Sequence, residues 1–280
     1  MHQKGSRIYR VFSTLFYVCG DNSHCNDAHR SKQKWHENTA VRFLLLLFIA
    51  SSLAACQSTG NTPNKPESDG ETGVLMVFSE REAGSPLFRS RVFVSDKYVY
   101  MDDARVPADF LLFNRQEQKV YTVNSSDKSV FVIEPKKIAI QSPIEIDYTE
   151  TSQPSSAIPT VGGGQATHYR YDANGKHCYD AVTLEKSFLP GVIDAFKEFR
   201  LVLAGEHASS LHRMPAENHD ACELALNIFY ATKHWGNGVP LREWDQKGYL
   251  KFMIDYREGF TMKSENLTIP ADYRQYSVSG

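Results

Sequence analysis

The chain lacks an apolar run long enough to span a membrane. Its longest run, from Phe43 to Ala55, is interrupted by Ser51 and Ser52 and is shorter than the roughly 20 apolar residues that a transmembrane helix needs. Residues Phe43–Ile49 are apolar on every side, so they also lack the stripe of an amphipathic core helix. The run therefore fits neither a membrane span nor a surface helix of a globular domain.

The sequence also lacks the charge pattern of a nucleic-acid-binding protein. Charged residues make up 23% of the chain, hydrophobic residues make up 41%, and the net charge is -2. These values are typical of a globular protein and not of a disordered one. No block of Lys and Arg interleaved with aromatic residues is present. We therefore expect an ordinary globular core and no nucleic-acid partner.

Familiar metal and hydrolase motifs are absent as well. None of the five cysteines has Cys-x-x-Cys spacing, and neither His-Glu-x-x-His nor Gly-x-Ser-x-Gly occurs. The group Cys19, His24, Cys25 and His29 has no second ligand pair for zinc. Gly162–Gly164 precedes a strand-like segment and not a helix, which favours a flexible connection over phosphate binding. We therefore predict no metal ligand, cofactor or catalytic residue.

What the sequence does contain is an export signal. Arg42 precedes the apolar run, and the run ends in small residues and a cysteine at Leu53–Cys56. A cation, a short apolar region and small residues form the order of a secretory signal. Leu53–Cys56 resembles the lipobox of bacterial lipoproteins. The resemblance implies that residues 41–55 are a signal peptide and that Cys56 is lipidated, begins the mature chain and anchors it to a membrane.

The segments on either side of this signal have distinct compositions. Residues 1–40 are polar and too long for the start of such a signal, so we expect an upstream extension, with translation starting at Val41. Gln57–Gly73 is polar and rich in Pro and Gly, which predicts a flexible tether with a reach of roughly 20–25 Å. In enteric lipoproteins an aspartate after the lipidated cysteine retains the protein in the inner membrane. Gln57 therefore implies the outer membrane, with the folded part facing the periplasm.

Period-two alternation starts at Val74 and predicts a series of short strands. Their short connections favour an antiparallel meander. Phe110–Phe113 and Val130–Ile133 are apolar on both faces, so they need cover on both sides or a cavity on one. The expected strands are Val74–Ser79, Leu87–Val94, Lys97–Asp102, Asp109–Asn114, Lys119–Asn124 and Ser129–Glu134.

Two hairpin regions follow. Ile144–Tyr148 alternates strictly and predicts a strand whose apolar side chains face the core. Glu150–Gln165 is rich in Ser, Pro and Thr and is expected to be a loop. Asn174-Gly175 lies between His168–Tyr171 and His177–Val182. This dipeptide predicts a two-residue type I′ turn between two strands.

Helices are expected in the last third of the chain. Apolar residues recur at spacings of three and four from Leu189 to Leu203. Ser187 is the expected N-cap of this helix, and Gly205 is its expected end. A second helix is predicted over Glu217–Lys233. The apolar face of the first helix consists of Leu189, Val192, Phe196, Phe199 and Leu203.

The chain then returns to strands, predicted at Tyr249–Tyr256 and Asn266–Pro270. An exported chain with a long meander, late helices, Gly238–Arg242 and a strand ending Asp255-Tyr256 resembles the lipoprotein-carrier fold of the Lol system, as does the ending Thr268–Tyr273. The resemblance covers Val74–Tyr273. It implies an α+β fold in which a curved antiparallel meander sheet, an incomplete β-barrel, packs over two or three helices around an apolar cavity.

We accordingly expect residues 74–280 to form one globular domain. The chain departs from the Lol pattern by a cysteine pair and a long helical insertion, and no cargo-contacting residue is matched. In an oxidising compartment the pair Cys178 and Cys222 predicts a disulfide. Closing a loop of about 45 residues stabilises a fold by roughly 4 kcal/mol.

The segment from His207 to Asp220 holds the remaining reactive side chains. His207 and His212 are five residues apart, about 140° around a helix, so they do not share a face. Polarity of a helix connection is therefore the favoured interpretation of this segment. Its reactive residues are His207, Ser209, Ser210, His212, Glu217, His219 and Asp220.

Three functions follow from these observations. The first is the binding of an apolar ligand or a lipid acyl chain in a cavity between sheet and helices. The second is a non-catalytic structural or interaction role with a protein partner in an envelope assembly. The third is a hydrolase that uses the segment His207–Asp220.

Overall fold

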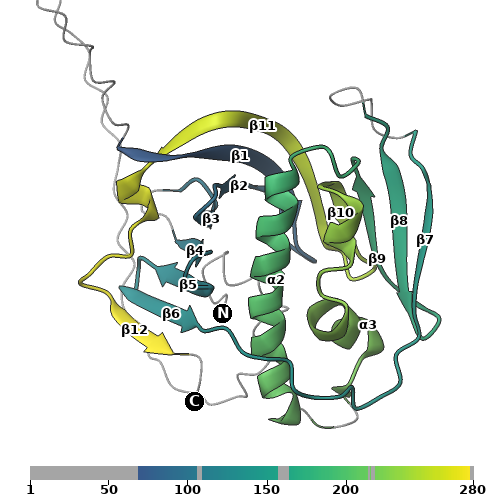
Figure 1. Cartoon of the computed structure of the whole chain (residues 1–280). Coiled ribbons are helices and arrows are strands. Elements are labelled where there is room, and N and C mark those ends of the chain that lie inside the picture. The colour runs from purple at the N-terminus through teal and green to yellow at the C-terminus, as the bar shows by residue number, and fades with distance from the viewer. Residues whose placement is uncertain (1–68, 106–108, 157–163, 214, 216–217, 278–280) are drawn as a thin grey trace, which may run out of the picture. The chain divides into compact units, whose positions relative to one another are not determined.

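One curved sheet organises the fold. The structure is a computed structural model that describes residues 69–105, 109–156, 164–213, 215 and 218–277. Figure 1 shows the sheet arching around the long helix α2 (Pro190–Ser210) without closing. The 12 described strands follow the order β12-β6-β5-β4-β3-β2-β1-β11-β10-β9-β8-β7. The predicted α+β class, with a curved and open sheet over helices, is confirmed.

Two antiparallel meanders make up this sheet. Strands β1 to β6 form the first and β7 to β11 the second, and β1 joins them by pairing with β11. The short strand β12 is parallel to its neighbour β6. The strands are β1 (Gly70–Arg81), β2 (Phe88–Val94), β3 (Tyr98–Asp102), β4 (Phe110–Asn114), β5 (Lys119–Asn124), β6 (Ser129–Ile133), β7 (Tyr148–Pro154), β8 (Thr167–Ala173), β9 (Lys176–Thr183), β10 (Pro240–Trp244), β11 (Leu250–Lys263) and β12 (Arg274–Ser277).

Apart from α2, the helical elements of the described residues are short. They are η1 (Leu211–Arg213), α3 (Ala221–Leu224), the π-helix η3 (Ala225–Phe229), η4 (His234–Asn237) and η5 (Ser264–Leu267). The predicted helix Glu217–Lys233 is therefore wrong as a single element. Within the described residues it begins at Ala221, where the Asp220 side chain accepts hydrogen bonds from the amides of Cys222 and Glu223. None of the helices described is long and apolar enough to cross a bilayer.

The first strand begins earlier than the sequence predicts. Residues 70–73, assigned to the tether, pair with residues 260–263 of β11. A Cβ atom at Gly70 would stand 2.3 Å from the carbonyl oxygen of Met262, and one at Gly73 would stand 2.1 Å from that of Val94. These glycines indicate close approach of neighbouring strands and not flexibility.

The hairpin prediction is confirmed, whereas the strand before it is placed wrongly. Asn174 and Gly175 both have positive φ, 52° and 72°, as a type I′ turn between β8 and β9 requires. Ile144–Tyr148 is not a strand. β7 starts at Tyr148 and continues to Pro154, inside the predicted loop.

The alternation of Ile144–Tyr148 nevertheless has a structural cause. Ile144 and Ile146 are partly buried against the helical end of the molecule, while Glu145 and Asp147 are exposed. Tyr148 stacks on Tyr230 with ring centroids 4.5 Å apart. The apolar side chains therefore pack on helices, and no strand partner is needed.

Helix α2 has the predicted apolar face but different ends. All five residues of that face are buried. The N-cap is Leu189, in the left-handed region at φ 48°, and Ser187 does not cap the helix. Gly205 does not end the helix, which continues to Ser210. A Cβ at Gly205 would stand 2.2 Å from the carbonyl oxygen of Lys136, so the position needs a residue without a side chain.

Later elements also differ from the sequence-based expectation. The predicted strand Asn266–Pro270 is wrong, since η5 ends at Leu267 and β12 follows only at Arg274. β11 is longer than Tyr249–Tyr256 and curves along the whole of β1. β10 is a strand that the sequence pattern does not predict.

Candidate functional site

Several predicted features lie outside the described residues. They are the extension 1–40, the signal 41–55, the lipidation residue Cys56, and the tether as far as residue 68. Gly162 and Gly163 of the glycine triplet also lie there, and so does Glu217. Lipidation at Cys56 therefore stays a prediction.

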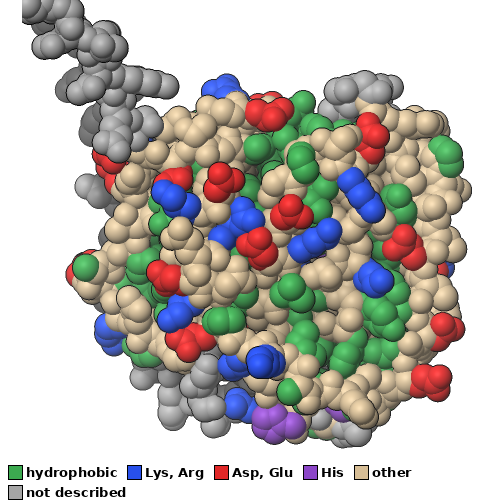
Figure 2. Space-filling view, viewed as in Figure 1, with side chains coloured by type: hydrophobic (Ala, Val, Ile, Leu, Met, Phe, Trp, Pro, Cys, Tyr) green, Lys and Arg blue, Asp and Glu red, His purple; other side chains and the backbone are tan. Residues whose placement is uncertain are grey.

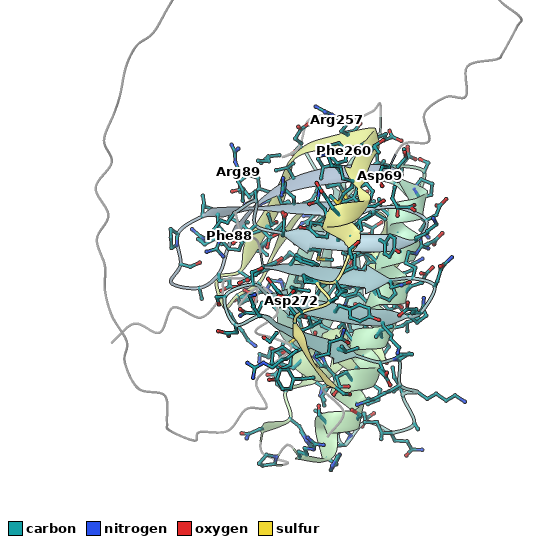
Figure 3. The ribbon with its side chains drawn as sticks, turned by 90° about the vertical axis from the view of Figure 1, so that its left-hand side faces the viewer. Asp69, Phe88, Arg89, Arg257, Phe260 and Asp272 are labelled. Carbon is teal, nitrogen blue, oxygen red and sulfur yellow. A yellow bond between two sulfur atoms is a disulfide. The ribbon has the colours of Figure 1, made fainter. Side chains whose placement is uncertain are left out.

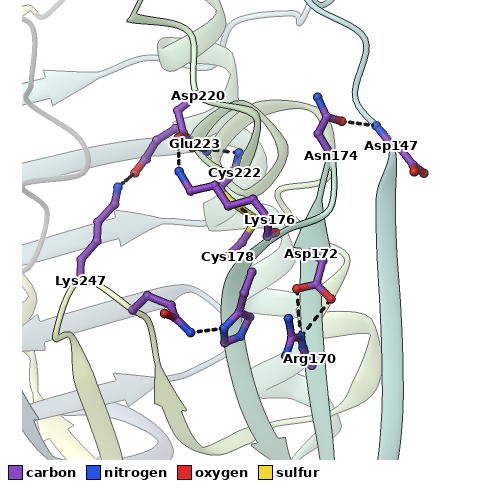
Figure 4. The surroundings of a disulfide bond; sticks show 12 residues. Asp147, Arg170, Asp172, Asn174, Lys176, Cys178, Asp220, Cys222, Glu223 and Lys247 are labelled. Carbon is purple, nitrogen blue, oxygen red and sulfur yellow. Dashed lines mark hydrogen bonds and ion pairs between the residues drawn. A yellow bond between two sulfur atoms is a disulfide. The ribbon is translucent and has the colours of Figure 1, made fainter.

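Cys178 and Cys222 form a disulfide, as the sequence predicts. The bond joins Cys178, near the start of β9, to Cys222 of α3. The two cysteines are 44 residues apart in the sequence. Both cysteines are buried in a small cluster with Ala173 and Ala225. Figure 4 shows the bond between the end of the β8–β9 hairpin and α3. It fixes the helical end of the molecule to the second meander.

Charged groups surround this disulfide. Lys176 Nζ lies 2.5 Å from Asp220 Oδ2, and Lys247 pairs with Glu223. Burial alone would raise the pKa of the Asp220 carboxyl, but the hydrogen bonds from Lys176 and from the amide of Glu223 lower it below its ordinary value. Asp220 is therefore held as a carboxylate that caps α3 and binds Lys176. This is a structural use of the residue.

The reactive side chains of the histidine segment are not brought together. His207 lies on α2, where burial and the charge of Arg200 lower its pKa to about 4. His212 is exposed in η1. Ser209 Oγ donates to the carbonyl of Glu206, and Ser210 Oγ donates to that of His207. Both serine hydroxyls thus donate to backbone carbonyls in the last turn of α2. Among these described side chains, neither serine is hydrogen-bonded to a histidine that could act as its base.

Strands that are apolar on both faces are packed on both faces. Leu111 and Phe113 of β4 belong to the core on the α2 side of the sheet. Phe110 and Leu112 belong to a second core on the outer side, where Leu267 of η5 is buried. Figure 3 shows the C-terminal ribbon, with Asp272 labelled, running across the outer side of these strands. Cover on both sides therefore comes from the chain itself.

A row of ionisable side chains lies within the α2 side of the sheet. Glu80 of β1 is opposite Lys251 of β11, and Lys251 is opposite Glu243 of β10. Lys251 Nζ lies 3.2 Å from Glu80 Oε1, and the Tyr179 hydroxyl donates to Glu243. Burial raises the pKa of Glu243. These contacts tie four strands together, and sequence reasoning missed them because the partners are far apart in the chain.

An open polar pocket of about 380 Å³ lies beside the start of α2. Tyr169 contributes an aromatic wall, while Lys186 and Glu185 contribute charges of both signs. This mixture does not favour an apolar ligand. The pocket is lined by Gln165, Thr167, Tyr169, Thr183, Glu185, Lys186, Ser187 and Asn237.

The outer face of the second meander and of β1 and β2 presents arginines. Strand register aligns two rows of side chains across it, and directly opposed residues share a face. One row runs Arg170, Asp180, Trp244, Leu250, Arg81. The next runs His168, Val182, Arg242, Phe252, Ser79, Arg89. We refer to the cations of these rows and their neighbours, Arg81, Arg89, Arg91, Arg170, Arg242 and Arg257, as the arginine face.

Two carboxylates beside these arginines are used internally. Asp102 is buried and accepts from Arg91 Nε at 2.8 Å, which raises the pKa of Arg91. Asp180 is buried, with His168 Nε2 2.8 Å from its Oδ1 and His177 Nε2 2.7 Å from its Oδ2. Asp255, opposite Val77, is exposed on the same face and is outnumbered by the arginines.

Four exposed arginines of the face have no ion-pair partner among the described residues. They are Arg81, Arg89, Arg242 and Arg257. The guanidinium of Arg242 lies 5.0 Å from the ring centroid of Trp244. On the side seen in Figure 2, by contrast, acidic and basic side chains are interspersed. The arginine face is therefore a basic surface, and it has no local signal in the sequence because its residues come from five strands.

Comparisons with known proteins found structural similarity alone. No family model matches the chain, and no curated protein matches it. An uncharacterized conserved protein from Thermus thermophilus is 10% identical, with a TM-score of 0.37 over 74% of this chain and 91% of that chain. PNGF-II is 7% identical, with a TM-score of 0.38, and MucB is 9% identical, with a TM-score of 0.34.

Coverage differs among these neighbours. The match includes 74% of this chain in each case, but only 31% of the PNGF-II chain and 61% of the MucB chain. Similarities this distant carry no argument about function, and they do not test the resemblance to the Lol system.

Proposed function

We propose that this chain is a cell-envelope lipoprotein, anchored through Cys56 in the outer membrane, whose folded part is a non-catalytic interaction domain. The lipobox-like Leu53–Cys56 supports the anchor. The observation that carries the interaction role is the arginine face, where exposed cations without ion-pair partners in the described chain stand in register on a sheet surface. Such a surface attracts an anionic partner.

An apolar ligand inside the arch is the weaker alternative. The α2 side of the sheet is filled, with Phe113 and Phe199 rings 5.7 Å apart and Phe196 stacked on Trp235 at 4.1 Å. The outer side of the first meander is covered by the C-terminal segment. An acyl chain would have to replace this packing, so surface binding is the function that the geometry supports best.

The hydrolase alternative loses support for a geometric reason. His207 is buried in α2, whereas His212 is exposed in η1. Asp220 is occupied by the α3 amides and Lys176. A hydrolytic site needs a nucleophile and a base within hydrogen-bond reach, and these residues do not supply that arrangement.

Photo-crosslinking in the host tests the proposal. A photoreactive amino acid is placed at Arg89 or at Arg242, with matched positions Lys137 and Lys186 as controls because both are exposed and lie away from the arginine face. We expect covalent adducts with a specific partner from the probes at Arg89 and Arg242, and no such adducts from the probes at Lys137 and Lys186. Adducts that are equally frequent at all four positions, or that arise at the controls alone, would overturn the interaction role of this face.

A further inference from the structure

We propose that the arginine face binds the headgroup layer of an anionic phospholipid bilayer, so that the domain lies with its outer sheet face on the membrane. This rests on the proposed function, whose partner it names. The membrane is the one to which Cys56 is expected to anchor the chain.

The charge of the face favours an anionic headgroup. Arg81, Arg89 and Arg242 are exposed and have no carboxylate partner among the described residues. The neighbouring carboxylates Asp102 and Asp180 are buried and already paired. A guanidinium group binds phosphate through two parallel hydrogen bonds. The face therefore offers phosphate-binding groups that no ion pair of the described chain occupies.

The arrangement of these groups favours a surface over a discrete ligand. The arginines are spread across strands β8, β10, β11, β1 and β2. A bilayer presents phosphate at any position, so several dispersed cations can be engaged at once. A small anion would engage only one or two of them.

Exposed and half-buried apolar side chains close in sequence or in register to the arginines also favour a membrane. Ile254 is 43% exposed and Leu87, next to Phe88 and Arg89, is 54% exposed. Phe252 and Trp244 are half-buried in the same rows as Arg242 and Arg81. Cations interspersed with Trp, Phe and Leu are the composition of protein surfaces that rest in the headgroup region.

The expected anchor would hold the whole domain, including this face, near a membrane. β1 carries Val77, Ser79 and Arg81 on this face and starts at Gly70, directly after the tether. The composition of residues 57–69 predicts a flexible tether, and a flexible chain of about 13 residues has an r.m.s. reach of roughly 20 Å. An anchored domain is thus confined near the bilayer, which raises the effective concentration of headgroups at its surface.

Vesicle partitioning tests the inference on the expected mature chain, residues 56–280, carrying Cys56→Ser, so that neither the apolar run Phe43–Ala55 nor acyl chains contribute to binding. The probes are vesicles of phosphatidylcholine alone and vesicles with about 30% phosphatidylglycerol, an anionic lipid. We expect binding to the anionic vesicles, weakening as salt is added, and little binding to the neutral ones. Equal binding to both, or to neither, would overturn the inference.

Matched variants locate the surface. Arg81→Ala, Arg89→Ala and Arg242→Ala together should weaken the partition coefficient roughly 100-fold, since each arginine near an anionic surface contributes about fivefold. Lys137→Ala, Lys186→Ala and Lys233→Ala remove the same charge from exposed positions beside α2 and should change it by less than about threefold. If the two triple variants lose equal vesicle affinity, net charge alone attracts the chain to the vesicles. That result would refute docking through the arginine face.

Failure of this inference is distinguishable from failure of the proposed function. If the chain ignores anionic vesicles while crosslinks from Arg89 and Arg242 reach a protein, the face is an interaction surface for that protein and the lipid inference is wrong. If vesicles bind and no crosslink forms at those positions in cells, the proposed role in the envelope is wrong. Circular dichroism of each triple variant, expected to match the parent, verifies folding.

Discussion

Gly205 lies inside α2, five residues before its last residue Ser210, and glycine inside a helix is less stable than alanine by about 1 kcal/mol. It is tolerated because the segment after β6 crosses the helix there, with the carbonyl oxygen of Lys136 where a Cβ would stand. We therefore expect Gly205→Ala to lower the free energy of unfolding by about 2–3 kcal/mol, since overpacking outweighs the gain in helix propensity. Urea denaturation measures this change.

Gly191 is the matched control in the same helix. A Cβ at Gly191 would meet no atom within 4 Å. Gly191→Ala should therefore leave stability unchanged or raise it by about 0.5–1 kcal/mol. Similar effects of the two substitutions would contradict the close approach at Gly205.

His234 makes stability depend on pH. It is buried against Tyr171, Tyr179 and Trp235, and burial together with the charge of Arg200 lowers its pKa to about 3. The unfolded chain binds this proton below a pKa of about 6.5, whereas the folded chain does not. The stability from neutral His234 is therefore complete above pH ~6.5 and is lost as the pH falls towards 3.

The expected contribution of His234 to the slope is about 1.4 kcal/mol per pH unit within that window. Urea denaturation between pH 7 and pH 4 measures it, and His234→Gln should flatten the dependence by that amount. An unchanged slope in the variant would mean that His234 is protonated in the folded state.

At the scale of elements, the disulfide holds the helical end to the sheet. The bond between β9 and α3 closes a loop whose two cysteines are 44 residues apart in the sequence. Replacing Cys178 and Cys222 together by Ala should lower the free energy of unfolding by about 4 kcal/mol in the chain-entropy model. Thermal unfolding with and without reductant checks this, and the double variant should be insensitive to reductant.

The C-terminal segment is the cover of the outer core. Leu267 of η5 is buried among Phe110, Leu112 and Val123. Leu267→Ala should lower the free energy of unfolding by about 2–3 kcal/mol. Leu201→Ala, at an exposed site on α2, should change it by less than about 0.5 kcal/mol. Equal effects in denaturation experiments would mean that η5 does not cover this core.

Elements with a strong internal pattern could be predicted, and those defined by distant partners could not. Strands β2 to β6 alternate or are apolar throughout, and α2 repeats at helical spacing, so local sequence identifies them. Every residue of β7 after Tyr148 is exposed, which leaves no apolar period to detect. β12 is polar and depends on parallel pairing with β6, and that register has no local signal.

For the whole molecule, an open sheet over helices was predictable, and the surface that it presents was not. Charge and hydropathy can be read along a chain, yet Arg81, Arg170 and Arg242 lie on separate strands. Only strand register brings them onto one face. The need to cover the apolar strands is predictable from their composition, but the source of that cover, the segment around Leu267, is not.

We propose that a lipid at Cys56 holds this domain on an envelope membrane, and mass spectrometry of the protein isolated from its host membranes can detect that lipid. We expect a chain whose first residue is Cys56 and whose mass is increased by a diacylglyceryl group on the Cys56 thiol. A chain that retains residues 41–55 and carries an unmodified Cys56 thiol would show that this anchor does not exist.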